Sequence, residues 1–160
     1  MRALIDRYLD AYNRMDVAAM LATMQDEVVF ENYTAGVLSV RTLGIAELRH
    51  LAESSRHLFS MRRQTITAWR EDGDSAHASI HFEGTFAVDL PNGVRAGQSI
   101  ALEGRSEFRQ HDGKLIYIGV ITVTSPNTGL TYLVTIEAPE EQYNQMLPTF
   151  NALLDSFMID

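Results

Sequence analysis

Apolar residues recur every three or four positions at the start of the chain, which is the spacing of one helix face. The residues on this face are Ala3, Leu4, Tyr8, Leu9 and Tyr12, with Asp6, Arg7, Asp10 and Arg14 opposite. Asp16 predicts the N-cap of a second helix in VAAMLATM. A third helical pattern occupies GIAELRHLAESSRHLF, residues 44–59. Helical patterns therefore dominate the first part of the chain.

The segment DEVVFENYTAG, residues 26–36, alternates between two faces and predicts a strand. The two faces are Val28, Phe30 and Asn32 on one side and Val29, Glu31 and Tyr33 on the other. Asn32 ends an otherwise apolar face, and a buried amide needs hydrogen-bond partners. It is therefore either a solvated strand end or part of a pocket. We interpret residues 34–44, which follow, as a short polar hairpin region.

Four turn signals divide the next part of the chain, namely EDGD at 71–74, PNG at 91–93, HDG at 111–113 and PNTG at 126–129. Each separates runs typical of antiparallel strands, at about 62–70, 75–89, 98–110, 114–124 and 130–137. The second and third runs have one apolar face and one charged face, which predicts a sheet with a single covered side.

The last segment, APEEQYNQMLPTFNALLDSFMID, predicts a helix that begins near Pro139 and is kinked by Pro148. Every basic residue lies at or before Lys114, so the end of the chain is purely acidic. Such a shift can mark an appended segment or one more strand and helix of the same domain, and we favour the second. We expect one α+β domain over 1–160, with N-terminal helices on a curved antiparallel sheet and residues 125–160 as a strand–helix extension.

Composition and charge exclude several classes of protein. The net charge of -8 over 160 residues argues against nucleic acid as a partner. The absence of cysteine excludes disulfides and thiolate chemistry. The N-terminus does not resemble a signal peptide, and no apolar run could span a bilayer. We therefore predict a cytoplasmic protein without a membrane partner.

The order of four segments resembles the SnoaL-like branch of the nuclear transport factor 2-like superfamily. The segments are RYLDAYNRMD, DEVVFEN, TLGIAELRHL and FRQHDGKLIYI, which together span about residues 1–120. The resemblance implies a cone-shaped curved sheet that wraps a helix and leaves a pocket open at one end. Members include polyketide cyclases, ketosteroid isomerase and limonene epoxide hydrolase, so the fold alone does not name the reaction. The closing residues 131–157 are similar to the end of a PsbP-like domain.

The resemblance to ketosteroid isomerase implies roles for three positions. Tyr8 falls where that enzyme keeps its oxyanion-binding tyrosine, Asn32 where it keeps its proton-shuttling carboxylate, and Ser106 where it keeps a protonated aspartic acid. An amide cannot act as a general base near neutral pH. The isomerase proton shuttle is therefore not expected here.

Our first hypothesis is a binding protein for a small apolar or amphipathic ligand, with no cofactor. The expected pocket residues are Tyr8, Phe30, Asn32, Phe82, Phe86, Ser106 and Phe108. Each also admits a purely structural role, since Tyr8 suits a helical core position, Asn32 a turn and Ser106 a crowded strand.

Two alternatives belong to other classes. The first is an enzyme of the cyclase or isomerase type that acts on an enolisable carbonyl, with Tyr8 as oxyanion donor. Its base would be a residue such as Glu31, Glu83 or His81, all assigned here to outward faces. The second is a scaffold that contacts a partner through the acidic helix at residues 138–160.

We predict no metal site. His77 and His81 share a strand face but lie about 13 Å apart at the usual rise per residue. His50, Glu53 and His57 fit the solvated face of a helix. The charged strand face admits cross-strand ion pairs or a homodimer interface, and we favour the homodimer.

Overall fold

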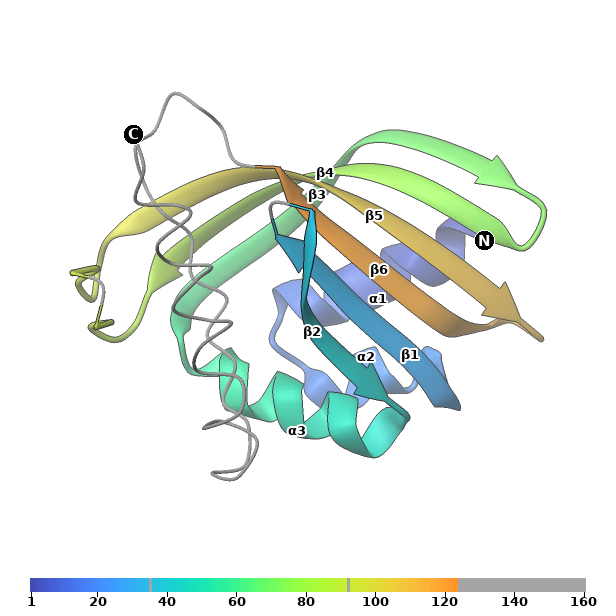
Figure 1. The fold of residues 1–160 in the computed structure, drawn as a ribbon, viewed down its shortest axis with the longest axis horizontal. Helices are drawn as coiled ribbons and strands as arrows, with labels where there is room; N and C mark the ends of the chain where they lie inside the picture. The colour runs from blue at the N-terminus through green and yellow to red at the C-terminus, as the bar shows by residue number, and fades with distance from the viewer. Residues whose placement is uncertain (35, 92, 124–160) are drawn as a thin grey trace.

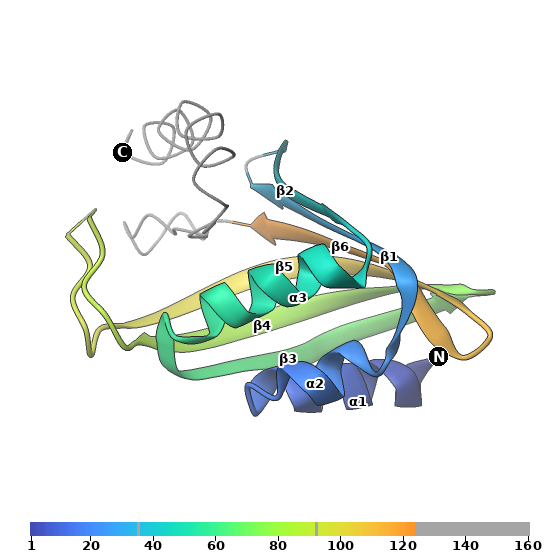
Figure 2. The same ribbon diagram turned by 90° about the horizontal axis from the view of Figure 1, so that it is seen from below.

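Three helices lie against the concave face of one curved sheet (Figures 1 and 2). This computed structural model describes residues 1–34, 36–91 and 93–123. The helices are α1 (Arg2–Asn13), α2 (Val17–Leu21) and α3 (Ile45–Arg56). The strands are β1 (Met24–Thr34), β2 (Val37–Leu43), β3 (Phe59–Asp72), β4 (Ser75–Phe86), β5 (Ser99–His111) and β6 (Lys114–Val123). The predicted α+β class is confirmed.

The strand order in the sheet is β2-β1-β6-β5-β4-β3. Neighbouring strands are antiparallel except β1 and β6, which are parallel. The expectation of a wholly antiparallel sheet is wrong at this one pair. The strand β6 lies between β5 and β1. It is antiparallel to β5, its neighbour in sequence, and parallel to β1, which comes from a distant part of the chain.

The core lies where the inner face of the sheet meets α1 and α2. Its fully buried side chains include Ile5, Leu21, Val28, Phe108 and Ile118. Phe30, Ile118 and Phe108 stand in register on β1, β6 and β5, so they form a row across the sheet. Burying each large apolar side chain contributes about 1.5–3 kcal/mol, so this row anchors the sheet to the helices.

The hairpin predicted at residues 34–44 is present, because Thr34 at the end of β1 pairs with Val37 at the start of the antiparallel β2. Ser39 and Thr42 of β2 are buried, whereas Val37 and Leu43 are 51% and 57% exposed. Val40 between them is also buried, so β2 buries two polar side chains beside one apolar side chain and leaves apolar residues exposed at both ends. A bulge at Ser39 disturbs the alternation of β2, since Asn32 and Tyr33 of β1 pair with Val40 and Leu38 and leave Ser39 as the extra residue.

Local signals fix the beginnings of two helices. Asp16 accepts a hydrogen bond from the Ala19 N–H at 3.0 Å, which confirms it as the cap of α2. Gly44 precedes α3 with a φ of +86°, a conformation that favours glycine, and its N–H donates to the Val28 carbonyl at 2.9 Å. These contacts hold α3 against β1.

The predicted strand at 130–137 and helix at 138–160 lie outside the described residues. In the described part of the chain, no helix is both long enough and apolar enough to cross a membrane.

Candidate functional site

A cavity of about 230 Å³ lies between the concave face of the sheet and helices α1 and α3. All six strands contribute to its wall, and the contribution of β2 is Val40. Most of the wall is apolar, formed by residues such as Phe30, Leu51, Ile80, Leu102 and Val120. The polar side chains on the wall are Tyr8, Tyr12, Asn32, Thr34, Ser55, Arg62, Gln64, Glu103, Ser106 and Thr122.

The structure brings five of the seven expected pocket residues to this cavity, namely Tyr8, Phe30, Asn32, Phe82 and Ser106. The other two do not line it. Phe86 stacks on Phe59 at a centroid distance of 5.0 Å, and Phe108 is 1% exposed beneath Tyr8. Both share the inner face, but they pack into the core because that face extends beyond the cavity.

Asn32 is buried in a small polar cluster. Its Nδ2 donates to Ser39 Oγ at 3.0 Å, and Ser39 Oγ donates to the Asn32 backbone carbonyl at 2.9 Å. Thr34 Oγ1 completes the cluster. Val120 on β6 separates Asn32 from Ser106 in the same row of the sheet. Because an amide has two N–H groups and an acceptor oxygen, Asn32 keeps hydrogen-bonding capacity for a ligand.

Tyr8 lies between two aromatic rings on the floor of the cavity. The Tyr12 centroid is 6.5 Å away, and the Phe108 ring meets Tyr8 edge-on at 5.9 Å. Burial is the main reason that the pKa of the Tyr8 hydroxyl is raised well above its ordinary value, with Tyr12 adding to the effect. Tyr8 is therefore a neutral hydrogen-bond donor rather than a base.

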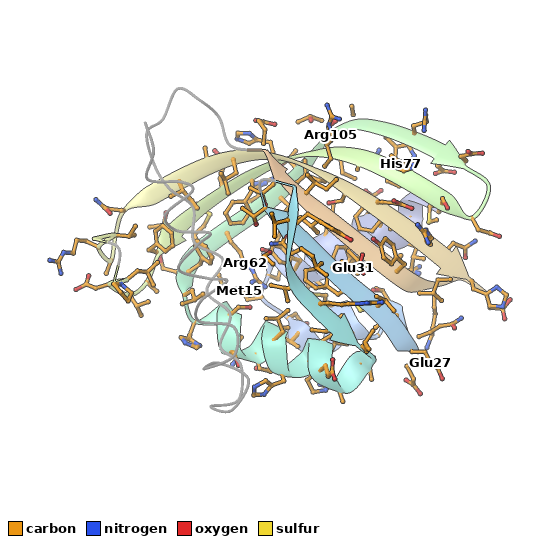
Figure 3. All side chains as sticks on the ribbon, in the orientation of Figure 1. Met15, Glu27, Glu31, Arg62, His77 and Arg105 are labelled. Carbon is orange, nitrogen blue, oxygen red and sulfur yellow. The ribbon has the colours of Figure 1, made fainter. Side chains whose placement is uncertain are left out.

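Arg62 is a cavity residue that the sequence analysis did not identify. It is 6% exposed, its Nε donates to the Tyr12 carbonyl at 3.1 Å, and its guanidinium lies 3.8 Å from the Tyr12 ring centroid. The sequence pattern that could have identified Arg62 is the period-2 spacing of β3, which puts it on the same face as Gln64 and Ile66. Figure 3 shows Arg62 on the concave side of the sheet, while His77 and Arg105 project from the convex side.

The candidate bases face away from the cavity, as the alternation predicted. Glu31 accepts hydrogen bonds from the hydroxyls of Tyr117 at 2.8 Å and Tyr33 at 3.0 Å, on the outer face. His81 is hydrogen-bonded to Glu103, which raises the pKa of the imidazole, and Glu83 is exposed.

Among the described residues that line the cavity, the only carboxylate is that of Glu103. Its side chain is 57% exposed and is bound to His81. Within the described ranges, no three His, Asp or Glu side chains form a group that could hold a metal ion. The cavity can thus orient a ligand and stabilise negative charge, with no described carboxylate aimed into it.

Three comparisons place these features among known proteins. The family model of the SnoaL-like domain matches residues 5–118. None of the curated proteins matches the chain in sequence.

Solved structures share the fold across different assigned reactions. A proposed polyketide cyclase from Xanthomonas campestris pv. campestris has a TM-score of 0.65 and 21% identity, covering 75% of this chain and 87% of that chain. A proposed hydroxylase from Streptomyces galilaeus has a TM-score of 0.63 and 18% identity, covering 78% and 90%. An epoxide hydrolase from M. tuberculosis has a TM-score of 0.61 and 15% identity, covering 76% and 80%. At these identities the likeness establishes the fold alone.

Proposed function

Because the chain belongs to the SnoaL-like domain family, we propose that it binds a small, largely apolar ligand in the cavity between its sheet and helices. The observation that carries this proposal is the wall of the cavity, which is mostly apolar and has a few buried polar groups. Tyr8, Asn32 and Ser106 are 5%, 4% and 5% exposed. Small-molecule sites commonly combine an apolar lining with a few polar groups that orient the ligand.

The proposed ligand is small because the cavity is small. Its volume of about 230 Å³ falls just below the range of about 300–1,000 Å³ for drug-sized ligands. Asn32 supplies a hydrogen bond but no proton transfer, so we propose binding without the isomerase proton shuttle.

A neutral, apolar fluorescent probe tests this proposal. We expect 1-aminoanthracene to gain fluorescence when it enters the cavity of the wild-type protein. Val120→Trp should abolish the gain, because the indole would fill space that the probe needs. Leu43→Trp is the matched control, since Leu43 is 57% exposed and does not line the cavity. Equal probe binding by both variants would contradict the proposal.

Tyr8 favours a second candidate, an enzyme that acts on an enolisable carbonyl. Its hydroxyl is a neutral donor without a hydrogen-bond partner among the described residues, as an oxyanion donor would require. The test is turnover of enolisable ketones by Tyr8→Phe and by variants that remove Glu31, Glu83 or His81. If the wild type turns over no such ketone, or if every variant matches it, this candidate fails.

We also propose that two copies of the chain pair through the outer face of the sheet. Ile121 is 47% exposed there, opposite Arg105 on the neighbouring strand β5, which also carries Glu107. Mixed charges around an apolar centre suit a two-fold contact, in which each surface meets its own copy. Sedimentation at micromolar concentration should give a mass near twice 18.0 kDa, and a single 18.0 kDa species would contradict the pairing.

A further inference from the structure

Arg62 is a buried cation on the wall of the cavity. It is 6% exposed and lies on β3, where alternation places it inward between the outward residues Met61 and Arg63, which are exposed. A guanidinium does not lose its proton in proteins, so burial cannot be relieved by neutralisation. Such a group needs hydrogen-bond acceptors or a counter-charge.

The fold supplies only part of what Arg62 needs. Its Nε donates to the Tyr12 carbonyl, in the last turn of α1, where free carbonyls carry partial negative charge. The guanidinium also lies over the Tyr12 ring. Asn13 fixes this arrangement, because its side chain makes two hydrogen bonds with the Gln64 backbone, at 2.7 and 3.1 Å.

The two terminal nitrogens of Arg62 remain without acceptors in the described part of the chain. No carboxylate of the described residues forms an ion pair with Arg62. Glu103, the carboxylate on the cavity wall, is bound to His81 and largely exposed, so it does not provide the counter-charge. Within residues 1–34, 36–91 and 93–123, the positive charge that the cavity presents is therefore not compensated by a carboxylate.

We infer that the ligand of this cavity carries a carboxylate, which pairs with the terminal nitrogens of Arg62 while the apolar body of the ligand lies against the apolar wall. This inference rests on the proposed binding function and adds the chemical class of the ligand. The planar guanidinium matches a carboxylate through two parallel hydrogen bonds. Exclusion of water from an apolar cavity strengthens such a pair relative to one at the surface.

A matched pair of probes tests the inference in the wild-type protein. 2-Naphthoate and 2-naphthamide have nearly the same shape, but only the first is an anion at neutral pH. Each is added as a competitor for 1-aminoanthracene. We expect 2-naphthoate to bind about tenfold to a hundredfold more tightly, as hydrogen bonds to charged groups allow.

Two variants of neighbouring residues assign the preference to Arg62. Arg62→Met keeps an unbranched side chain without the charge and should lower the affinity for 2-naphthoate much more than that for 2-naphthamide, so that the preference for the anion disappears. Arg63→Met removes a charge from the opposite, exposed face and should leave the preference intact. Arg62→Lys keeps the charge without the planar pair of donors, so we expect an intermediate preference.

The outcomes separate this inference from the proposed function. If the wild type binds 1-aminoanthracene but does not prefer 2-naphthoate, the carboxylate assignment is wrong and the binding proposal stands. If the preference persists in Arg62→Met, the assignment to Arg62 is wrong. If the wild type does not bind 1-aminoanthracene at all, the binding proposal fails together with the inference.

Discussion

The inner and outer faces of the sheet differ in how their charged groups are partnered. On the outer face, the Glu31 carboxylate accepts hydrogen bonds from two tyrosine hydroxyls, and its Oε1 lies 3.3 Å from Arg41 Nε. Glu107 lies 2.7 Å from Arg109, which covers the Tyr117 ring. On the inner face, Arg62 has a backbone carbonyl and an aromatic ring but no described carboxylate.

This difference separates groups explained by the fold from a group that the fold leaves incomplete. The outer carboxylate of Glu31 is largely buried, yet its hydrogen bonds and ion pair are made within the chain. The outer Arg105 is exposed to solvent. Arg62 is buried and has no ion pair with any described carboxylate, whereas buried polar groups of native proteins are generally satisfied. The comparison therefore points to the inner face as the place where an external group binds.

The largest expected effect contrasts two phenylalanines of the inner face. Phe108→Ala should lower the free energy of unfolding by about 3–5 kcal/mol, because Phe108 is 1% exposed in the core. Phe82→Ala should cost clearly less, since Phe82 is only partly buried and borders the cavity. Urea unfolding measures both values. Equal losses would mean that the cavity is packed as tightly as the core.

A smaller effect is expected on the outer face. Glu31→Leu leaves the Tyr33 and Tyr117 hydroxyls without their acceptor and should lower the free energy of unfolding by about 1–3 kcal/mol. Glu27→Leu, an exposed position earlier on the same strand, is the control and should change stability by less than about 0.5 kcal/mol. Thermal denaturation of the two variants at neutral pH compares them. Indistinguishable curves would show that the Glu31 contacts do not stabilise the fold.

The same cluster predicts a dependence on alkaline pH. Burial, followed by the hydrogen bond to Glu31, raises the pKa of Tyr117 from 10.0 to about 12 in the folded protein. The neutral phenol is thus favoured by folding, so its stabilising contribution is complete below pH 10 and is lost as the pH rises toward 12. Tyr117→Phe should flatten the fall in stability across this interval. An unchanged pH profile would contradict the assignment.

The smallest expected effect on stability is that of Arg62→Met. The Tyr12 carbonyl keeps a hydrogen bond from the Met15 N–H at 3.0 Å, so the substitution does not leave it unpaired. Removing an uncompensated buried charge should then leave the free energy of unfolding unchanged or raise it. A loss as large as that of Glu31→Leu would instead indicate that Arg62 serves the fold.

Hydrophobic periodicity and turn residues were enough to predict the α+β class, α1 to α3 and the strands from β3 to β6. They did not predict the burial pattern of β2, where Ser39 and Thr42 are buried beside Val40 while Val37 and Leu43 are exposed. Periodicity and turn residues also could not show which part of the inner face borders the cavity and which part is covered by the helices. For this reason Phe82 and Phe108, which share that face, were both assigned to the pocket, although only Phe82 lines it.

Arg62 was missed for a related reason. It stands at the start of a charged strand segment, MRRQ, where an arginine is usually solvated. Its burial depends on Tyr12 and on the curvature that brings α1 over β3, and neither is visible in local sequence. The polar positions Tyr8, Asn32 and Ser106 were identified by resemblance to a family, and the structure places all three on the cavity wall.

A crystal structure of the protein with 2-naphthoate tests the central claim most directly. The account predicts the naphthalene ring inside the cavity and both carboxylate oxygens about 2.7–2.9 Å from the terminal nitrogens of Arg62. A naphthoate bound on the outer face, or one whose carboxylate points away from Arg62, would contradict it.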